Sequence, residues 1–420
     1  MIDLVVEGRL FLDGELKQGC VGIENGRIVA VKKVLRGETK IDAGYRIVLP
    51  AAMDPHVHFR QPGMTNKEDF GSGSLAALHG GVTTVLDMPN TLPPTDRLAA
   101  LKDKKRIIRG RSYVDYGMFV TTDLPRRLEA MAPHAAGLKI FMGSTTGSLL
   151  DNDDKSIHRM LRKAEALNVP VSVHAEDDSM IFHEEADSLK DHLRNRPADA
   201  EFNAVRRLIA LGAKGVNICH VTRAEVLDMA IEAGMSSEVA AHHMLLDIES
   251  PLGARGKVNP PLRQPLAKEA LYHAVAHGKA TMMGSDHAPH TADEKAEDFD
   301  ICPSGVPGVE TMFPLMMAAV KRNDIPLATL VRMACEEPAR RFNVPKGRIE
   351  EGMVADLAIY DPRVISIIEG SRLYSKCGWT PYEGMEAIFP QTVIMHGEIQ
   401  LKGGEPCGET IGRDIKDEPL

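Results

Sequence analysis

Two histidines separated by one residue are the clearest sign of chemistry in the chain. His56 and His58 follow the apolar run 47–49, and Arg60 comes two residues later. Residues i and i+2 of a β-strand point to the same face, so both imidazoles can bind one metal ion. A guanidinium on that face suits a substrate carboxylate or phosphate. The segment predicts activated water beside an anion site, although an HxH pair alone is as often structural.

Three more potential ligands stand where other apolar runs end. His174 closes the run 169–174, His220 closes 216–220, and Asp286 follows 280–284. A lone histidine at a strand end is more often a hydrogen-bonded core residue than a ligand. Five candidates at one rim favour metal ligands over core residues. A set of imidazoles and a carboxylate suits zinc, manganese, cobalt or iron.

Lys139 lies inside the apolar run 137–142. Burying an ammonium is costly, so burial favours the neutral, nucleophilic amine. Such an amine can capture CO2 and become a carbamate whose two oxygens bridge two metals. On this run alone, a lysine that extends its ammonium to the rim is the simpler interpretation.

Alternating strands and helices must position these side chains. Apolar runs at 47–53, 82–88, 114–120, 137–142, 169–174, 216–220, 239–243 and 280–284 alternate with helical segments such as 97–108 and 157–167. Eight βα units are most simply closed as an α/β fold of the (β/α)8 TIM-like barrel type, with its active site at the C-terminal strand ends. An open doubly wound sheet is the alternative, but no GxGxxG follows the first strand. The barrel is expected over residues 51–344.

Both chain ends have β patterns. Short strands occupy residues 1–50, with turns at Asp13-Gly14 and Asn25-Gly26. Strand patterns return at 348–353, 355–360, 392–395 and 398–401, and the polar tail from about Gly403 is expected to be disordered. Residues 1–50 and 345–420 should together form a small β-sandwich domain.

The composition is typical of a soluble globular protein. The 420 residues are 43% hydrophobic and carry a formal net charge of −9, which disfavours nucleic acid and anionic membranes as partners. No apolar run approaches the ~20 residues that cross a bilayer. Six cysteines without a CxxC pair indicate neither a disulfide framework nor a thiolate zinc site. The N-terminus lacks a basic region, so we expect a cytoplasmic protein.

The set of motifs resembles the dihydroorotase family, in the cyclic amidase branch of the amidohydrolase superfamily. The likeness spans about residues 1–400 and rests on HVHFRQPG, DMPN, GLKIFMGSTTG, VHAE, ICHVT, KVNPPLR, SDHAPH and SGVPGVET. Each motif is shared with relatives, whereas the set is specific. SDHAPH together with Asn90 favours dihydroorotases over allantoinases and hydantoinases.

The resemblance implies two divalent metal ions, most simply zinc. Six side chains would hold them: His56, His58 and Asp286 the first, His174 and His220 the second, and a carboxylated Lys139 both. A hydroxide between the metals would attack the ring amide of dihydroorotate. Asp286 would act as general acid and base, and the reaction would reverse toward N-carbamoyl-aspartate.

The resemblance also implies a substrate site for a carboxylate, which dihydroorotate carries and hydantoin, dihydrouracil and allantoin lack. Arg60, Asn90 and His290 match the substrate-binding positions, and Asn259 in KVNPPLR does so less closely. From the residues alone, Asn90 could equally be a turn residue and His290 a loop residue.

Ser144, Thr145 and Thr146 are candidates for a mobile lid. They stand between Gly143 and Gly147 at the expected catalytic rim, where hydroxyls could donate to a substrate. An ordinary βα turn is an equal alternative. The segment departs from relatives with an Asn-Glu-Thr-Phe-like loop and resembles a second subgroup.

The implied activity is the reversible cyclisation of N-carbamoyl-L-aspartate to L-dihydroorotate in pyrimidine biosynthesis. Alternatives are another cyclic amidase, such as a hydantoinase (dihydropyrimidinase) or allantoinase, a mononuclear deaminase, or a catalytically silent scaffold subunit. The complete ligand set argues against the scaffold, and Lys139 argues against the deaminase. The resemblance leaves open a homodimer and an association with aspartate carbamoyltransferase.

Overall fold

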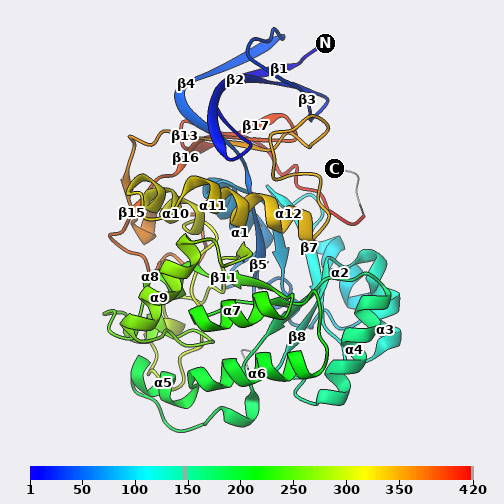
Figure 1. Cartoon of the computed structure of the whole chain (residues 1–420), viewed down its shortest axis with the longest axis vertical. Helices are drawn as coiled ribbons and strands as arrows, with labels where there is room; N and C mark the ends of the chain where they lie inside the picture. Colours follow the sequence, from blue (N-terminus) through cyan, green and yellow to red (C-terminus); the bar gives the residue numbers. More distant parts are fainter. Residues whose placement is uncertain (145–148, 418–420) are drawn as a thin grey trace.

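Two eight-stranded sheets organise the molecule (Figure 1). The computed structural model describes residues 1–144 and 149–417. One sheet is parallel and is surrounded by helices, whereas the other is built from the two ends of the chain and lies at one end of the molecule. The N-terminal part of the chain therefore lies in the second sheet, the middle forms the parallel sheet, and the C-terminal part lies in the second sheet again.

The parallel sheet follows the chain in order. Its strands are β5 (Ala52–Val57), β6 (Val82–Asp87), β7 (Asp115–Val120), β8 (Gly137–Phe141), β9 (Val171–His174), β10 (Asn217–Ile218), β11 (Ser236–Val239) and β12 (Met282–Met283). Each strand pairs in parallel with the next. A parallel bridge between Val57, at the end of the first strand, and His287, in the segment after the last strand, closes the sheet. The predicted (β/α)8 barrel is confirmed.

Helices cover the outside of the barrel (Figure 1). They are α1 (Phe70–His79), α2 (Leu98–Ile108), α3 (Pro125–Met131), α4 (Asp154–Ala166), α5 (Leu189–Asn195), α6 (Ala198–Ala210), α7 (Ala224–Glu232), α8 (Ala241–Leu245), α9 (Pro265–Ala276), α10 (Met312–Lys321), α11 (Leu327–Val331) and α12 (Glu337–Arg341). Helix α4 shows why they form: Asp153 caps it by accepting from the Ser156 amide, and Ile157, Met160 and Leu161 are buried. The helices expected at 97–108 and 157–167 are α2 and α4.

The second sheet joins both chain ends. Its order is β18-β17-β16-β13-β4-β1-β2-β3. The bounds are β1 (Leu4–Leu12), β2 (Glu15–Glu24), β3 (Arg27–Lys32), β4 (Thr39–Pro50), β13 (Leu357–Tyr360), β16 (Pro390–Met395), β17 (Glu398–Lys402) and β18 (Glu405–Pro406), while β14 (Ser366–Ile367) and β15 (Glu386–Ala387) form a separate pair. Val6, Ile23 and Leu357 belong to one buried cluster, so the two ends share a core of their own.

Four local predictions were wrong. Residues 47–50 belong to β4 of the second sheet, and the first barrel strand begins only at Ala52. The run 239–243 continues from β11 into α8, because an apolar run alone does not distinguish a strand from a buried helix. Residues 348–353 form turns instead of a strand. The described part of the tail expected to be disordered packs on the barrel, because Asp414 forms a parallel bridge with Tyr116.

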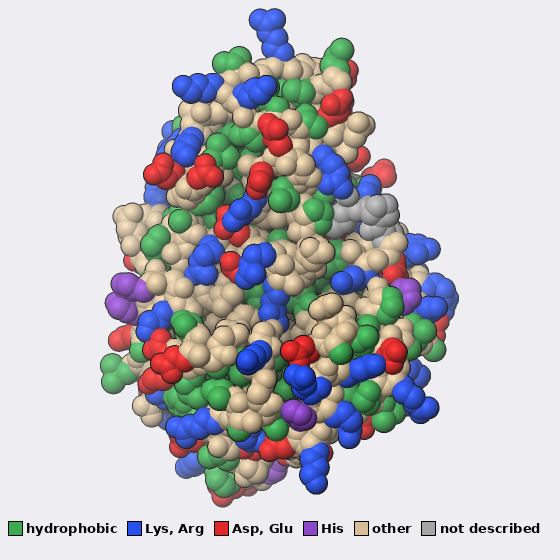
Figure 2. Space-filling model, turned by 45° about the vertical axis from the view of Figure 1, so that its right-hand side comes forward, with side chains coloured by type: hydrophobic (Ala, Val, Ile, Leu, Met, Phe, Trp, Pro, Cys, Tyr) green, Lys and Arg blue, Asp and Glu red, His purple; other side chains and the backbone are tan. Residues whose placement is uncertain are grey.

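The surface mixes both signs of charge. On the face drawn in Figure 2, basic and acidic side chains are interspersed. The excess of 59 Asp and Glu over 50 Lys and Arg is therefore not gathered into one patch on this face. Among the described residues, no helix is long and apolar enough to cross a membrane.

Candidate metal centre

One cavity at the C-terminal ends of the barrel strands gathers most of the predicted site residues. Its volume is about 50 Å3. Its lining includes all six proposed metal ligands and three of the proposed substrate residues: His56, His58, Lys139, His174, His220, Asp286, Arg60, Asn90 and Asn259. Residues up to 230 positions apart in the chain thus face the same space, because parallel strands bring their C-terminal ends to one rim.

His56, His58 and Asp286 form the first group of donors. Their ligand atoms lie within 4.8 Å of one another, and all three side chains are buried. Asp286 Oδ1 lies 3.4 Å from His56 Nε2 and 3.2 Å from His58 Nε2. Asn90 Oδ1 lies 2.6 Å from His58 Nδ1 and accepts a hydrogen bond from it, which leaves Nε2 of His58 to bind a cation.

The electrostatics of this group suit a cation. Burial lowers the pKa of His58 to about 4, so its ring is neutral. Burial and Lys139 oppose protonation of His56, but Glu238 and Asp286 outweigh them and raise the pKa of His56 to about 10. Burial also opposes ionisation of Asp286, yet His56 and His58 hold the pKa of Asp286 well below its usual range. The carboxylates thus attract positive charge between the two imidazoles.

His174 and His220 form the second group and face each other. His174 Nδ1 lies 3.0 Å from His220 Nε2. Glu176 accepts from His174 Nε2 at 2.8 Å and is itself paired with Arg196. The proton of His174 therefore resides on Nε2, and its Nδ1 presents a lone pair. Burial holds the pKa of both imidazoles below the usual range, and neutral imidazole is the form that binds metal.

Lys139 lies on β8 between these groups and does not extend to the rim. Its side chain is 1% exposed. Its Nζ donates to Cys219 Sγ at 2.9 Å. The interpretation of a lysine that reaches solvent was therefore wrong, because the barrel wall encloses it. An amine in the wall of a cavity lined by imidazoles can supply a bridging group after carboxylation.

Arg60 lines the cavity from an unexpected backbone conformation. It has a φ of 60°, so it does not continue the strand face of His56 and His58 as the spacing predicted. Its Nε donates to the Pro289 carbonyl oxygen at 3.1 Å. The guanidinium is 2% exposed, and burial lowers its pKa to about 10, so it remains charged at neutral pH.

His290 lies behind Arg60 and is not part of the cavity lining. Its Nε2 is 3.1 Å from Arg60 Nη2, and its Nδ1 is 3.1 Å from Lys67 Nζ. Burial, with the charges of Arg60 and Lys67, holds the pKa of His290 far below its usual range. The Nε2 of a neutral His290 donates to the Ser304 carbonyl oxygen at 3.1 Å and its Nδ1 accepts from Lys67, so His290 contacts the Arg60 guanidinium without accepting from it.

The remaining predicted residues fall in different places. Asn259 lines the cavity, and its Oδ1 lies 3.0 Å from His192 Nε2. The Ser144 amide donates to Asp178, and its carbonyl oxygen accepts from Arg196. Thr145 and Thr146 lie outside the described residues, so the lid stays a prediction.

The sequence pattern described as "Amidohydrolase family" matches residues 47–398. The chain belongs to the amidohydrolase family. Curated relatives of this amidohydrolase include the dihydroorotase of Thermoplasma acidophilum, 36% identical over 98% of this chain and 97% of the relative. The dihydroorotase of Halobacterium salinarum is 38% identical over 98% and 99%. That of Methanosarcina acetivorans is 37% identical over 93% and 90%.

Solved structures of cyclic amidases are similar to this amidohydrolase along the whole chain. The L-hydantoinase (dihydropyrimidinase) from Arthrobacter aurescens has a TM-score of 0.94 and 25% identity, covering 99% of this chain and 100% of its own. The dihydropyrimidinase from Brevibacillus agri has a TM-score of 0.90 and 26% identity, covering 98% of each chain.

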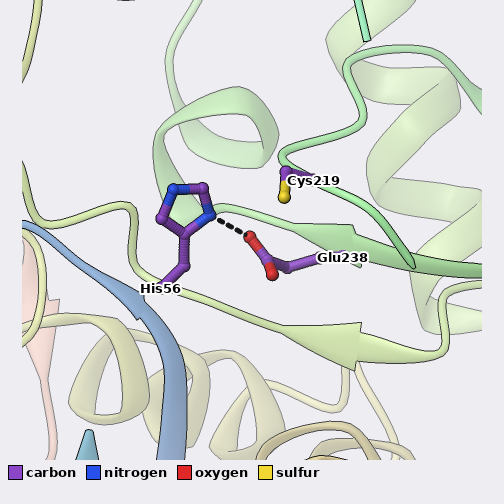
Figure 3. A group of neighbouring side chains, drawn as sticks. All are labelled: His56, Cys219 and Glu238. Carbon is purple, nitrogen blue, oxygen red and sulfur yellow. Dashed lines mark hydrogen bonds and ion pairs between the residues drawn. The ribbon is translucent and has the colours of Figure 1, made fainter. Parts of the chain in front are cut away.

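The sequence analysis missed three polar residues that contact the site of this amidohydrolase. Glu238 accepts from His56 Nδ1 (Figure 3), Glu176 accepts from His174, and Trp379 Nε1 donates to the His290 carbonyl oxygen at 2.8 Å. Glu176 follows His174 by two residues, and Glu238 is a lone carboxylate in a barrel strand, so the sequence could have indicated both as site residues. The sequence did not indicate Trp379, because it comes from a segment distant from the barrel strands.

Proposed function

We propose that this amidohydrolase is a dihydroorotase, which interconverts N-carbamoyl-L-aspartate and L-dihydroorotate in pyrimidine biosynthesis. The buried Arg60 guanidinium in the cavity wall carries the proposal. Burying a cation is costly without an anionic partner, and dihydroorotate brings a carboxylate that hydantoin, dihydrouracil and allantoin lack. The dihydroorotase relatives at 36–38% identity support the same choice.

Two divalent metal ions, in our proposal zinc, belong to this function. His56, His58 and Asp286 would hold one, and His174 and His220 would hold the other. Carboxylated Lys139 would contribute to both. When bound, the metals would supply Lewis-acid activation of water and of the ring carbonyl.

Asp286 would move the proton in the reaction. Its carboxylate lines the cavity and is ionised, so it can accept a proton from water during ring opening. The same group returns that proton to the ring nitrogen that leaves. In the reverse direction, Asp286 takes the proton from the carbamoyl nitrogen of N-carbamoyl-aspartate as the ring closes.

Arg60 would fix the orientation of the substrate. A planar guanidinium pairs with a carboxylate through two parallel hydrogen bonds, which fixes both the position and the rotation of the ring. The Pro289 carbonyl oxygen accepts from the guanidinium on the side where His290 contacts it. Asn259, whose amide lines the cavity, would donate or accept at the polar edge of the ring.

Assaying dihydroorotate, dihydrouracil, hydantoin and allantoin side by side tests this proposal. We expect dihydroorotate to have the highest kcat/KM, with N-carbamoyl-aspartate cyclised in the reverse direction. A preference for an uncharged ring would instead identify a hydantoinase or allantoinase, the alternative that the similar structures of hydantoinases favour.

A further inference from the structure

Lys67 closes the turn that starts at Arg60 and contacts the residue behind that arginine. The Met64 amide donates to the Arg60 carbonyl oxygen, and the Lys67 amide donates to the Met64 carbonyl oxygen, both at 3.0 Å. Lys67 Nζ then lies 3.1 Å from His290 Nδ1 and 2.7 Å from Glu294 Oε1. The side chain is only 14% exposed, so the ammonium is held between an imidazole and a carboxylate.

The ammonium of Lys67 determines which nitrogen of His290 carries the ring proton. An ammonium can only donate hydrogen bonds, so Nδ1 must accept and the proton must lie on Nε2. Nε2 donates to the Ser304 carbonyl oxygen at 3.1 Å, and the same nitrogen lies 3.1 Å from Arg60 Nη2. Burial, together with the nearby cations, keeps the pKa of His290 far below its usual range, so the ring binds no second proton at neutral pH. His290 therefore presents no lone pair to Arg60.

A carboxylate on the other side of Lys67 would favour the opposite tautomer. Glu294 Oε2 lies 3.7 Å from His290 Nδ1, and the Thr291 amide donates to the same oxygen at 3.0 Å. Burial opposes ionisation of Glu294, but the hydrogen bonds from Lys67 and Thr291 outweigh burial and hold the pKa of Glu294 below its usual range. Without Lys67, this carboxylate would attract the ring proton to Nδ1. The free lone pair on Nε2 would then accept from Arg60 Nη2.

The tautomer of His290 decides which donors Arg60 offers to a substrate. Arg60 Nε already donates to the Pro289 carbonyl oxygen at 3.1 Å, so pairing with a carboxylate through two hydrogen bonds must use the two Nη groups. With the proton on Nε2, His290 does not accept from Nη2, and the guanidinium stays available to the cavity. A lone pair at that position would bind Nη2 and rotate the guanidinium toward His290. It would also remove the hydrogen bond from His290 to Ser304, which lines the cavity.

We propose that Lys67 is a positioning residue that determines specificity for a substrate bearing a carboxylate. By donating to His290 Nδ1, it holds the ring proton on Nε2 and leaves both Nη groups of Arg60 to the substrate. Lys67 is not among the described residues that line the cavity, so it acts through His290 and Arg60. The identity of the carboxylate rests on the dihydroorotase function proposed above, whereas the tautomer is a property of the protein without substrate.

Steady-state kinetics of three full-length variants test the role of Lys67. Lys67→Met should raise KM for dihydroorotate about 10- to 100-fold, because hydrogen bonds to the substrate carboxylate are lost, and should change kcat by less than about threefold. Lys67→Arg, which also only donates, should keep KM within about threefold of the wild-type value. Lys376→Met, the control, removes an ammonium that binds Thr65 and Asp69 of the same turn and should leave KM unchanged. An unchanged KM in Lys67→Met, or a loss confined to kcat, would overturn the proposal.

Nuclear magnetic resonance measures the tautomer without any substrate. In full-length protein with isotope-labelled histidine, long-range proton–nitrogen correlations distinguish a proton on Nδ1 from one on Nε2, and the His290 signals are those lost in His290→Gln. We expect the proton on Nε2 in the wild type and in Lys67→Arg, and on Nδ1 in Lys67→Met. A wild-type proton on Nδ1, or an Nε2 proton that persists in Lys67→Met, would contradict the proposal. The wild-type spectrum decides it if the variant does not fold.

Failure of the proposed function would give a different result. A wild-type preference for an uncharged ring would refute the dihydroorotase assignment, but it would not alter the tautomer of His290 or its dependence on Lys67. Turnover of dihydroorotate with a tautomer that does not depend on Lys67 would refute only the role of Lys67.

Discussion

Three site residues hold backbone conformations that their types rarely adopt. Arg60, His220 and Asp286 have φ values of 60°, 37° and 47°. Left-handed conformations of non-glycine residues cost on the order of 1 kcal/mol or more, and they persist where the surrounding structure demands them. Each of the three residues follows the end of a barrel strand, where strand alternation no longer directs the side chain. The strained backbone turns all three toward the cavity.

Replacing Arg60 tests the anion site. Arg60→Met should lower kcat/KM for dihydroorotate by roughly 100-fold, because a charge-assisted hydrogen-bond pair contributes about 3 kcal/mol. Both side chains are unbranched at Cβ, so the backbone strain stays the same. Metal content should not change. Arg60→Lys, which keeps the charge but loses the planar fork, should recover only part of the activity. Unchanged kinetics in Arg60→Met would remove this residue from the substrate site.

Replacing Asn90 separates a role toward the metal from a role toward the substrate. Asn90→Ala removes the acceptor of His58 Nδ1, so metal affinity at the first position should fall about 10- to 100-fold. Competition with a chromophoric chelator measures that affinity. Asn90→Asp restores an acceptor and should recover most of it. A rise in KM with unchanged metal affinity would show that Asn90 contacts only the substrate.

At the scale of elements, a buried ion group connects the barrel to the second sheet. Lys346 Nζ is paired with Asp115 at the start of β7 and with Asp356, next to β13, at 2.6 Å. His396, which follows β16, lies 2.9 Å from the same Asp115 carboxylate. Elements from the middle and the end of the chain therefore meet at one cation. Removing that cation would take the lysine ammonium away from two buried carboxylates.

Lys346→Met should lower the free energy of unfolding by about 3–5 kcal/mol at pH 8. Burial opposes ionisation of Asp115, but Lys346 and His396 together outweigh burial and hold the Asp115 pKa below its usual range. This pairing therefore stabilises the native protein above about pH 4 and is lost as the pH falls through the native-state pKa. In the variant, the buried carboxyl of Asp115 takes up a proton as the pH falls. Protonation removes the buried charge and so recovers part of the free energy of unfolding.

The loss in the free energy of unfolding caused by Lys346→Met should consequently be smaller at pH 5 than at pH 8. Urea denaturation at both pH values measures it. Lys17→Met removes an exposed partner of Asp13 and should change stability by less than about 1 kcal/mol at either pH. A deficit that does not vary with pH would mean that lost packing, and not the unpaired carboxylates, causes the destabilisation.

At the scale of the whole molecule, the candidate ligands lie around most of the barrel. They come from β5 and the residue after it, from β8 and β9, and from the segments after β10 and β12. A metal bound to them would link strands that hydrogen bonds connect only through their neighbours. Metal binding should therefore stabilise the entire barrel and not only the loops around the cavity.

Removing the metal tests that connection. Chelation should abolish turnover and lower the midpoint of thermal unfolding, since a ligand at 100 times its Kd adds about 2.7 kcal/mol to stability. Zinc with bicarbonate should restore both, whereas zinc in CO2-depleted buffer should restore turnover slowly, because the proposed metal centre requires a carboxylated Lys139. Lys139→Gln should show no bicarbonate effect. An apoprotein with the same unfolding midpoint would contradict the proposed link between strands.

The sequence by itself determined the barrel class and the candidate ligands. Residue type and strand-end position are local properties, so His56, His58, His174, His220 and Asp286 could be selected without coordinates. Short apolar runs could not be divided between sheets, because the run 47–53 is apolar throughout, yet residues 47–50 pair with β13 and residues 52–53 pair with β6. Element boundaries therefore needed the tertiary structure.

Only the tertiary structure decided how these side chains meet. The positive φ of Arg60, the support that Trp379 gives His290, and the approach of Cys219 and Glu238 to His56 all depend on contacts between distant segments. No spacing rule encodes them, because neighbouring strands of a closed barrel set the distances. Residue types in the sequence thus identified most candidate donors, and barrel closure determined which of them are close enough to bind the same cation.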